Sequence, residues 1–210
     1  MANAPARRAL VVIDVQNEYI DGKFLIEYPD VSISLPNVAR AMDAAHRHQV
    51  PIVMVQHILP ESAPIFARGS RGADVHESIA SKPYDHHIEK TLPSCFAGTD
   101  FGAWLKANSI DTIAVVGYMT HNCDDSTMRQ AMHEGYQVEF LVDAAGSLPY
   151  ENKAGAGVGQ GDPHGGQRGD AIHFCRRGEH RGVDRGAGRR RRVRARQYLR
   201  VQPALRGDAF

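Results

Sequence analysis

Cys123 occupies a position where a cysteine can act as a nucleophile. The residues before it, Ile113 to Gly117, form a short apolar run ending in glycine, which predicts a buried strand of a parallel sheet. After it, Met128, Ala131 and Met132 have a spacing typical of a helix. Unpaired N–H groups at a helix start favour a thiolate and can hold an oxyanion. Because a free cysteine can equally be a small buried apolar residue, this position alone leaves both interpretations open.

Two further strand ends carry groups that could assist such a thiol. The apolar run Ala9 to Ile13 is followed by Asp14, and the short run from His86 ends in Lys90. Ligands of open α/β sheets bind outside the carboxyl ends of the strands, so three such strands would bring an acid, a cation and a thiol to one edge. Taken separately, Asp14 could cap a turn and Lys90 could be a solvated lysine. Their joint occurrence with Cys123 makes a catalytic role the better interpretation.

The motifs around these residues resemble those of the isochorismatase-like cysteine hydrolases, a superfamily that includes nicotinamidases and ureidoacrylate and maleamate amidohydrolases. The similarity extends over about residues 8–153. It rests on Val12-Ile-Asp-Val-Gln-Asn17 with Tyr19, on Glu89-Lys-Thr91 with Ser94-Cys-Phe96, on Gly117-Tyr-Met-Thr-His-Asn-Cys123, and on Asp143-Ala144.

The resemblance implies roles for individual residues. Asp14, Lys90 and Cys123 would form the catalytic triad of the superfamily. The backbone amides of Met119 and Cys123 would hold the oxyanion, and the peptide bond between Tyr118 and Met119 would be cis.

The implied reaction is hydrolysis of a carbon–nitrogen bond in a small amide through a covalent thioester. Lys90 and the helix start are expected to lower the pKa of the Cys123 thiol. Asp14 is expected to take the proton, protonate the departing amine or ammonia, and activate the water. The cysteine argues against true isochorismatase activity, which cleaves a vinyl ether. The predicted partners are a small-molecule amide substrate and water, without a cofactor, and the resemblance also implies a homo-oligomer.

Three residues are predicted to bind the substrate: Gln16, Tyr19 and Tyr118. His57 ends the second predicted strand and is interpreted as a hydrogen-bonded structural histidine. Nicotinamidases have an Asp-x-His metal motif at this position, whereas this chain has Val55-Gln-His57, so no metal is predicted. The substrate itself stays open among nicotinamide, carbamoyl compounds, acyclic monoamides and lactams.

Strands and helices are predicted to alternate. Apolar runs predict strands at 9–14, 51–57, 110–117 and 136–143, and residues 86–90 are a further short strand candidate. Helical patterns predict helices at 36–49, 99–108 and 124–135. Pro36 is expected at a first helical position, and Asp124 and Asp125 in a first turn facing solvent. This order predicts an α/β fold, a three-layer α/β/α sandwich on a mostly parallel, Rossmann-like sheet. Residues 59–84 are the candidate specificity loop because ordinary connections are shorter.

Length and composition are those of one soluble α/β domain. The 210 residues suit a single such domain. Three cysteines without framework spacing argue against a disulfide scaffold, and Cys95 and Cys175 are interpreted as non-catalytic. The residues from Met1 to Arg8 lack the apolar core of a signal peptide, and no run approaches the ~18 apolar residues of a membrane span. The chain is therefore expected to be cytoplasmic, without membrane contact.

The composition changes at Ala154. Residues 154–210 contain 13 Arg, five Asp or Glu, no Lys and 12 of the 20 Gly, a net charge of +8 that leaves −7 for residues 1–153. No hydrophobic period continues through residues 155–196, so no strand or core helix is predicted there. One interpretation is a basic nucleic-acid-binding arm centred on Arg189 to Arg192. Another is a disordered tail.

A frameshift explains more of these features. Abundant Arg, Gly and Ala without Lys is what a GC-rich gene yields when it is translated out of frame. Residues 155–185 can be back-translated with freely chosen synonymous codons and then read one base out of frame. The amino-acid sequence obtained in this way can contain a helical pattern, an apolar strand and the start of a helix. The sandwich predicted for residues 1–153 still lacks those elements, and the resemblance implies that members of the family usually end with them. We therefore expect a hydrolase domain at residues 1–153 and a frameshift, in the gene or the sequence record, near residues 154–156.

Two alternatives to an active hydrolase remain. A catalytically silent family member could serve as a binding or scaffold subunit, and would show no turnover of amides and ordinary thiol reactivity. A nucleic-acid-binding protein is the weaker alternative because it rests on the tail alone. It requires salt-dependent DNA binding that is lost when residues 154–210 are deleted.

Overall fold

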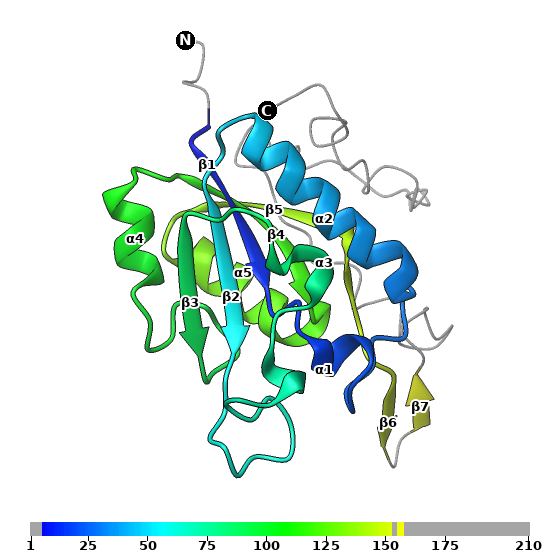
Figure 1. Cartoon of the computed structure of the whole chain (residues 1–210). Coiled ribbons are helices and arrows are strands. Elements are labelled where there is room, and N and C mark those ends of the chain that lie inside the picture. The colour runs from blue at the N-terminus through cyan, green and yellow to red at the C-terminus, as the bar shows by residue number, and fades with distance from the viewer. Residues whose placement is uncertain (1–5, 153–154, 158–210) are drawn as a thin grey trace, which may run out of the picture.

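Five parallel strands form the central sheet. The computed structural model describes residues 6–152 and 155–157. The strand order is β3-β2-β1-β4-β5 (Figure 1). The strands are β1 Arg8–Ile13, β2 Ile52–His57, β3 His86–Lys90, β4 Thr112–Tyr118 and β5 Gln137–Gly146. Each of the five predicted strands is therefore present, with bounds within about three residues of those expected.

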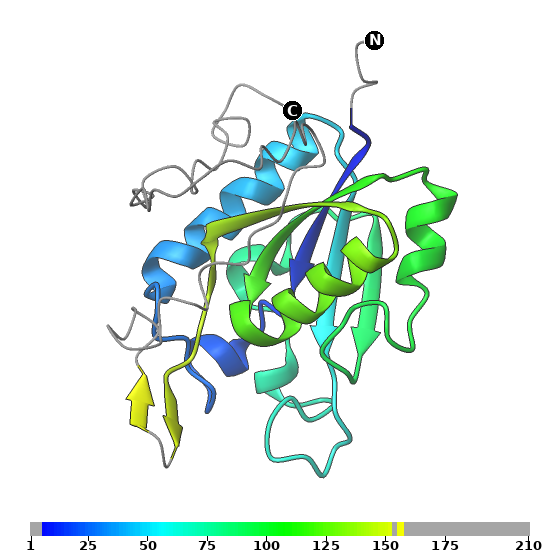
Figure 2. The same cartoon turned by 180° about the vertical axis from the view of Figure 1, so that it is seen from behind.

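Helices cover both faces of this sheet. They are α1 Asn17–Ile20, α2 Val31–Arg47, α3 Glu77–Ala80, α4 Phe101–Ala107 and α5 Asp125–His133, with a 3-10 turn η1 at Arg71–Ala73 and a π-helical turn η2 at Thr120–Asp124. Helix α2 lies on one face (Figure 1), and α4 and α5 lie on the other (Figure 2). The predicted three-layer α/β/α sandwich is confirmed.

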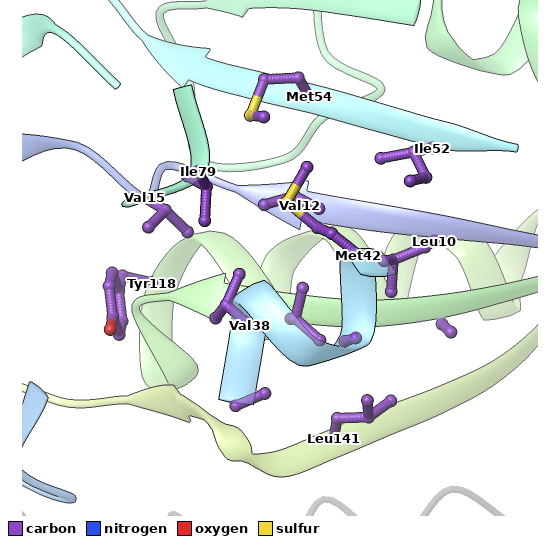
Figure 3. Packing of buried hydrophobic residues seen from close by; sticks show 14 of the residues in the cluster. Leu10, Val12, Val15, Val38, Met42, Ile52, Met54, Ile79, Tyr118 and Leu141 are labelled. Carbon is purple, nitrogen blue, oxygen red and sulfur yellow. The ribbon is translucent and has the colours of Figure 1, made fainter. Parts of the chain in front are cut away.

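The central strand β1 contributes to two separate cores because successive side chains of a strand point to opposite faces. Leu10 and Val12 pack against α2 in one core (Figure 3). Val11 and Ile13 pack against α4 and α5 in the other. A strand buried on both faces needs apolar side chains throughout, which explains why its sequence is a continuous apolar run.

Helix α2 begins earlier than predicted. Its N-cap is Asp30, whose carboxylate accepts a hydrogen bond of 2.8 Å from the Ser32 N–H. Pro36 lies inside the helix, so the expectation that it occupies the first helical position is wrong. The missing N–H of proline costs one helical hydrogen bond, which the cap and the buried side chains of Val38 and Met42 offset.

A small antiparallel pair follows β5, formed by β6 Tyr150–Asn152 and β7 Gly155–Gly157. The prediction that no strand occurs from Gly155 onward is therefore wrong for these three residues, because backbone pairing needs no side-chain periodicity. Residues 158–210, with Cys175, lie outside the described residues, so the domain boundary and the frameshift stay predictions. In the part of the chain that the structure describes, no helix is long and apolar enough to cross a membrane.

Candidate active site

Asp14, Lys90 and Cys123 meet at the carboxyl edge of the sheet. Asp14 follows β1, Lys90 is the last residue of β3, and Cys123 lies in η2 directly after β4. The Lys90 Nζ atom lies 2.7 Å from Asp14 Oδ2 and 3.2 Å from Cys123 Sγ. Because β2 lies between β3 and β1, the Lys90 side chain extends past the end of β2 to reach Asp14. The structure thus brings the three predicted side chains together, and their catalytic roles stay a prediction.

The backbone at this edge is closely constrained. Asp14 has a φ of 50° in the left-handed region, which is uncommon for a residue with a side chain. Its neighbour Ile13 pairs with Gly117 of β4. Gly117 has a φ of 118°, and an added Cβ would lie 2.0 Å from the Ile13 carbonyl oxygen. Only glycine therefore allows β4 to approach β1 this closely just before the cysteine.

The net pKa shift of the Cys123 thiol differs from the expected one. Burial alone would lower the pKa of Lys90, but the negative charges of Asp14 and of a Cys123 thiolate more than offset it and raise that pKa. Burial raises the pKa of the Cys123 thiol, Asp14 raises it further, and Lys90 opposes this only in part. Lys90 therefore acts on the thiol pKa in the expected direction, but the net pKa of Cys123 is raised and not lowered. Because the charge of Lys90 is also paired with Asp14, it offsets the effect of burial only in part.

Gln16, predicted to bind substrate, is completely buried. Its side-chain oxygen accepts a hydrogen bond of 2.8 Å from the His57 N–H. Its side-chain nitrogen donates to the carbonyl oxygens of His57 and Ala73, at 2.9 and 2.6 Å. Gln16 therefore links the segment that follows β1, which contains Asp14, to the end of β2 and to the loop of residues 59–84. A direct substrate contact by Gln16 stays a prediction.

The other two predicted substrate-binding residues belong to an aromatic cluster. The rings of Tyr19 and Tyr118 lie 5.8 Å apart between centroids, and Tyr19 lies 5.0 Å from Phe66 of the long loop. Tyr118 is buried at the edge of the α2 core (Figure 3), and its hydroxyl is 2.9 Å from the Ser34 hydroxyl. This cluster packs the long loop against the site, and contact of either tyrosine with substrate stays a prediction.

The backbone before the cysteine has the predicted geometry. The Tyr118–Met119 peptide bond is cis. The Met119 carbonyl accepts from the amides of Asn122 and Asp124, at 3.0 and 3.3 Å. Among the described residues, the Met119 N–H makes no backbone hydrogen bond. That N–H is free to donate to another group, as an oxyanion donor must be.

Asp124 does not face solvent. The side chain is fully buried, and within the described residues neither carboxylate oxygen has a hydrogen-bond partner. Burial, and secondarily the charge of Asp14, raises the pKa of Asp124 well above its usual range. The solvent-facing prediction is therefore wrong for Asp124, because the π-helical η2 turns its last residues away from α-helical positions. Asp125 is partly exposed and pairs with Arg129 at 2.7 Å.

His57 contacts the triad. Its Nδ1 atom lies 3.2 Å from Lys90 Nζ, and the two residues are register partners in the β2–β3 pair. The sequence indicated a hydrogen-bonded histidine but not its partner, because strand order cannot be read from the histidine itself. Burial, and then the charge of Lys90, lowers the pKa of His57.

Asp14, His57 and Cys123 also offer ligand atoms that all lie within 4.8 Å of one another. The Lys90 ammonium lies within 3.2 Å of each of these three side chains. A divalent cation would therefore have to displace a positive charge from this place. The absence of a metal here, which Val55-Gln-His57 led us to expect, stays a prediction, and the position of Lys90 supports it. Cys95, by contrast, is sealed in the core, and burial raises its pKa to about 12.

Comparison with known proteins gives consistent matches. A family model described as the isochorismatase domain matches residues 8–160. The secreted isochorismatase effector Isc1 of Verticillium dahliae is 34% identical over 137 residues, covering 65% of this chain and 71% of that protein. A Burkholderia xenovorans LB400 structure described as an isochorismatase is 57% identical, covers 74% of each chain and has a TM-score of 0.72. N-carbamoylsarcosine amidase from Thermoplasma acidophilum is 26% identical, with 67% of this chain and 82% of that one covered, and a TM-score of 0.62.

Proposed function

The chain belongs to the isochorismatase family of hydrolases, and from this premise we propose that it cleaves the carbon–nitrogen bond of a small amide through a thioester on Cys123. The observation that carries the proposal is the buried Lys90 ammonium, which lies within 3.2 Å of both Asp14 and Cys123. A thiol and an acid, both in contact with one cation and within 4.8 Å of each other, form an arrangement suited to nucleophilic catalysis by cysteine. The similarity to an amidase supports the choice of bond.

Acylation begins from the neutral thiol. Asp14 takes the Sγ proton as the sulfur attacks the substrate carbonyl, so a C–S bond forms while the carbonyl oxygen becomes negative. The Met119 and Cys123 amides would hold that oxyanion. Lys90 keeps its proton, because its pKa is raised, and it stabilises the negative charge on the sulfur until the bond forms.

Collapse of this intermediate breaks the C–N bond. The proton held by Asp14 goes to the departing nitrogen, which leaves as an amine or ammonia. Asp14, again a carboxylate, then accepts a proton from water as the water attacks the thioester. The C–S bond breaks, the carboxylic acid leaves, and the proton returns to the sulfur.

The test is a panel of small amides assayed with the wild-type chain and with Cys123→Ala, Asp14→Asn and Lys90→Met. The panel would contain nicotinamide, N-carbamoyl amino acids, acyclic monoamides and lactams. We expect hydrolysis of at least one class, and a loss of about 10²–10⁴-fold in kcat for each variant. Cys95→Ala serves as the control, because that thiol lies outside the triad.

Two results would contradict the proposal. Undiminished hydrolysis by Cys123→Ala would remove the cysteine from the mechanism. Failure of the folded wild-type chain on the whole panel would favour the alternative of a silent binding or scaffold subunit.

A further inference from the structure

His57 is held in a fixed position beside the triad. It is the last residue of β2, and both its N–H and its C=O are bonded to the side chain of Gln16. Its ring packs edge-on against Phe66, with 5.4 Å between centroids. Since the Gln16 contacts are to the His57 backbone, they survive replacement of the His57 side chain.

Lys90 determines which ring nitrogen of His57 carries the hydrogen. The Lys90 ammonium has only donors, so the Nδ1 atom at 3.2 Å must accept. A neutral imidazole that accepts at Nδ1 carries its hydrogen on Nε2. A doubly protonated ring would set two cations against each other, and the lowered pKa of His57 agrees with the neutral form.

The Nε2–H group has no partner in the described part of the chain. No hydrogen bond of Nε2 occurs there, and Nε2 is not among the buried polar atoms without partners. The His57 side chain is partly exposed, whereas Asp14 and Cys123 are buried. This donor is therefore open to solvent on a ring that has one nitrogen within 4.8 Å of the Cys123 sulfur.

The strand order places this donor relative to the reacting atoms. In the order β3-β2-β1-β4-β5, the strands β2 and β4 flank β1 on opposite sides. His57 ends β2, Asp14 follows β1, and Met119 follows β4. A substrate whose carbonyl oxygen points to the Met119 amide and whose nitrogen faces Asp14 extends toward His57.

We infer that the Nε2–H of His57 orients the substrate by donating a hydrogen bond to an acceptor beyond the scissile amide. The inference rests on the proposed function and narrows its substrate class. The preferred amides carry a second acceptor, such as a carbonyl, carboxylate or ring nitrogen, next to the amide group. A site built around such a donor discriminates against substrates that lack the acceptor.

Two substitutions distinguish a hydrogen bond from His57 Nε2 to the substrate from a structural role in which His57 Nδ1 only positions Lys90. In His57→Asn, the side-chain oxygen lies where Nδ1 was and can still accept from Lys90, but no donor reaches the Nε2 position. In His57→Gln, the amide group reaches the Nε2 position and restores the donor. His87→Asn is the control, since His87 is an exposed histidine on the neighbouring strand, bonded to Gln56 at 2.7 Å.

The experiment measures kcat/KM of these variants on the amides that the wild-type chain hydrolyses, grouped by whether they carry a second acceptor. We expect His57→Asn to lose about tenfold on amides with the acceptor, mainly through KM, and little on those without it. His57→Gln should recover most of that loss. The opposite order, with Asn active and Gln impaired, would show that His57 only positions Lys90 and would overturn the inference.

Nitrogen-15 spectra of the imidazole give a readout that does not depend on turnover. We expect a neutral ring with hydrogen on Nε2 in the wild-type chain near pH 7. A ring with hydrogen on Nδ1, or a charged ring, would also overturn the inference. Retained activity of Cys123→Ala would instead contradict the proposed function while leaving the assignment of the ring hydrogen intact.

Discussion

Lys90 and Asp14 form an ion pair of 2.7 Å in which both side chains are completely excluded from solvent. Removing one partner of such a pair leaves a buried charge without compensation, which is far more costly than removing both. The same contact that the proposed chemistry requires is therefore also a contact on which folding depends.

Replacement of Lys90 by Met tests this dependence. We expect the free energy of unfolding to fall by about 3–5 kcal/mol, and the double variant Asp14→Asn/Lys90→Met to recover part of that loss. Urea denaturation near pH 7 measures both. The exposed pair Arg68–Glu89, also 2.7 Å long, is the matched control, and Arg68→Met should leave the midpoint almost unchanged. Equal effects at the two pairs would contradict the prediction.

Asp14→Asn should make the Cys123 thiol more reactive toward alkylation while it slows hydrolysis. The charge of Asp14 raises the thiol pKa and occupies Lys90. Without that charge, Lys90 pairs with the thiolate, so more thiolate is present near pH 7. The rate of alkylation by iodoacetamide, followed by mass spectrometry, should therefore rise as kcat falls. Lys90→Met should slow the alkylation of Cys123. A slower alkylation rate in Asp14→Asn would show that Asp14 and the Cys123 thiolate do not compete for the charge of Lys90.

Asp124→Asn should stabilise the protein at neutral pH. Because folding raises the pKa of Asp124, the folded chain retains a proton that the unfolded chain releases above about pH 4. The wild-type chain thus loses stability as the pH rises above that value, and Asn removes this loss. We expect a gain of about 1–3 kcal/mol near pH 7 that shrinks toward pH 4. Asp125→Asn, at the partly exposed neighbour, should show no such pH-dependent gain.

Gly117→Ala should disrupt the site. An alanine Cβ would overlap the Ile13 carbonyl, and the φ of 118° is unfavourable for any L-residue with a side chain. We expect a loss of more than about 3 kcal/mol in unfolding free energy. Gly98 also has a positive φ but nothing within 4 Å of an added Cβ, so Gly98→Ala should cost only about 1–2 kcal/mol. Thermal unfolding of both variants separates the close approach from backbone strain alone.

Intact-protein mass spectrometry tests whether the composition change at Ala154 comes from a frameshift. A mass that departs from 23.1 kDa and agrees with a one-base shift near residues 154–156 is the expected result. Agreement of the measured mass with the printed sequence would reject an error in the sequence record.

The sequence predicted β1 and β4 well because these inner strands are buried on both faces and so read as uninterrupted apolar runs. The meeting of Asp14, Lys90 and Cys123 followed from that, since the ends of parallel strands share an edge. The contact of His57 with Lys90 was missed because it depends on the pairing of β2 with β3, and the sequence of one strand does not reveal its neighbour. The burial of Asp124 was missed because a π-helical turn breaks the 3.6-residue period on which the expectation rested.

The three triad residues come from three strands, and the middle of these, β1, has neighbours on both sides. Inner strands of this kind open only when the whole domain unfolds, so their amide hydrogens exchange most slowly. Asp14 and Cys123 follow inner strands of this kind, whereas Lys90 ends β3, which is an edge strand. On heating, β3 should therefore open first and take Lys90 away from Asp14, so hydrolysis should be lost before the inner strands unfold.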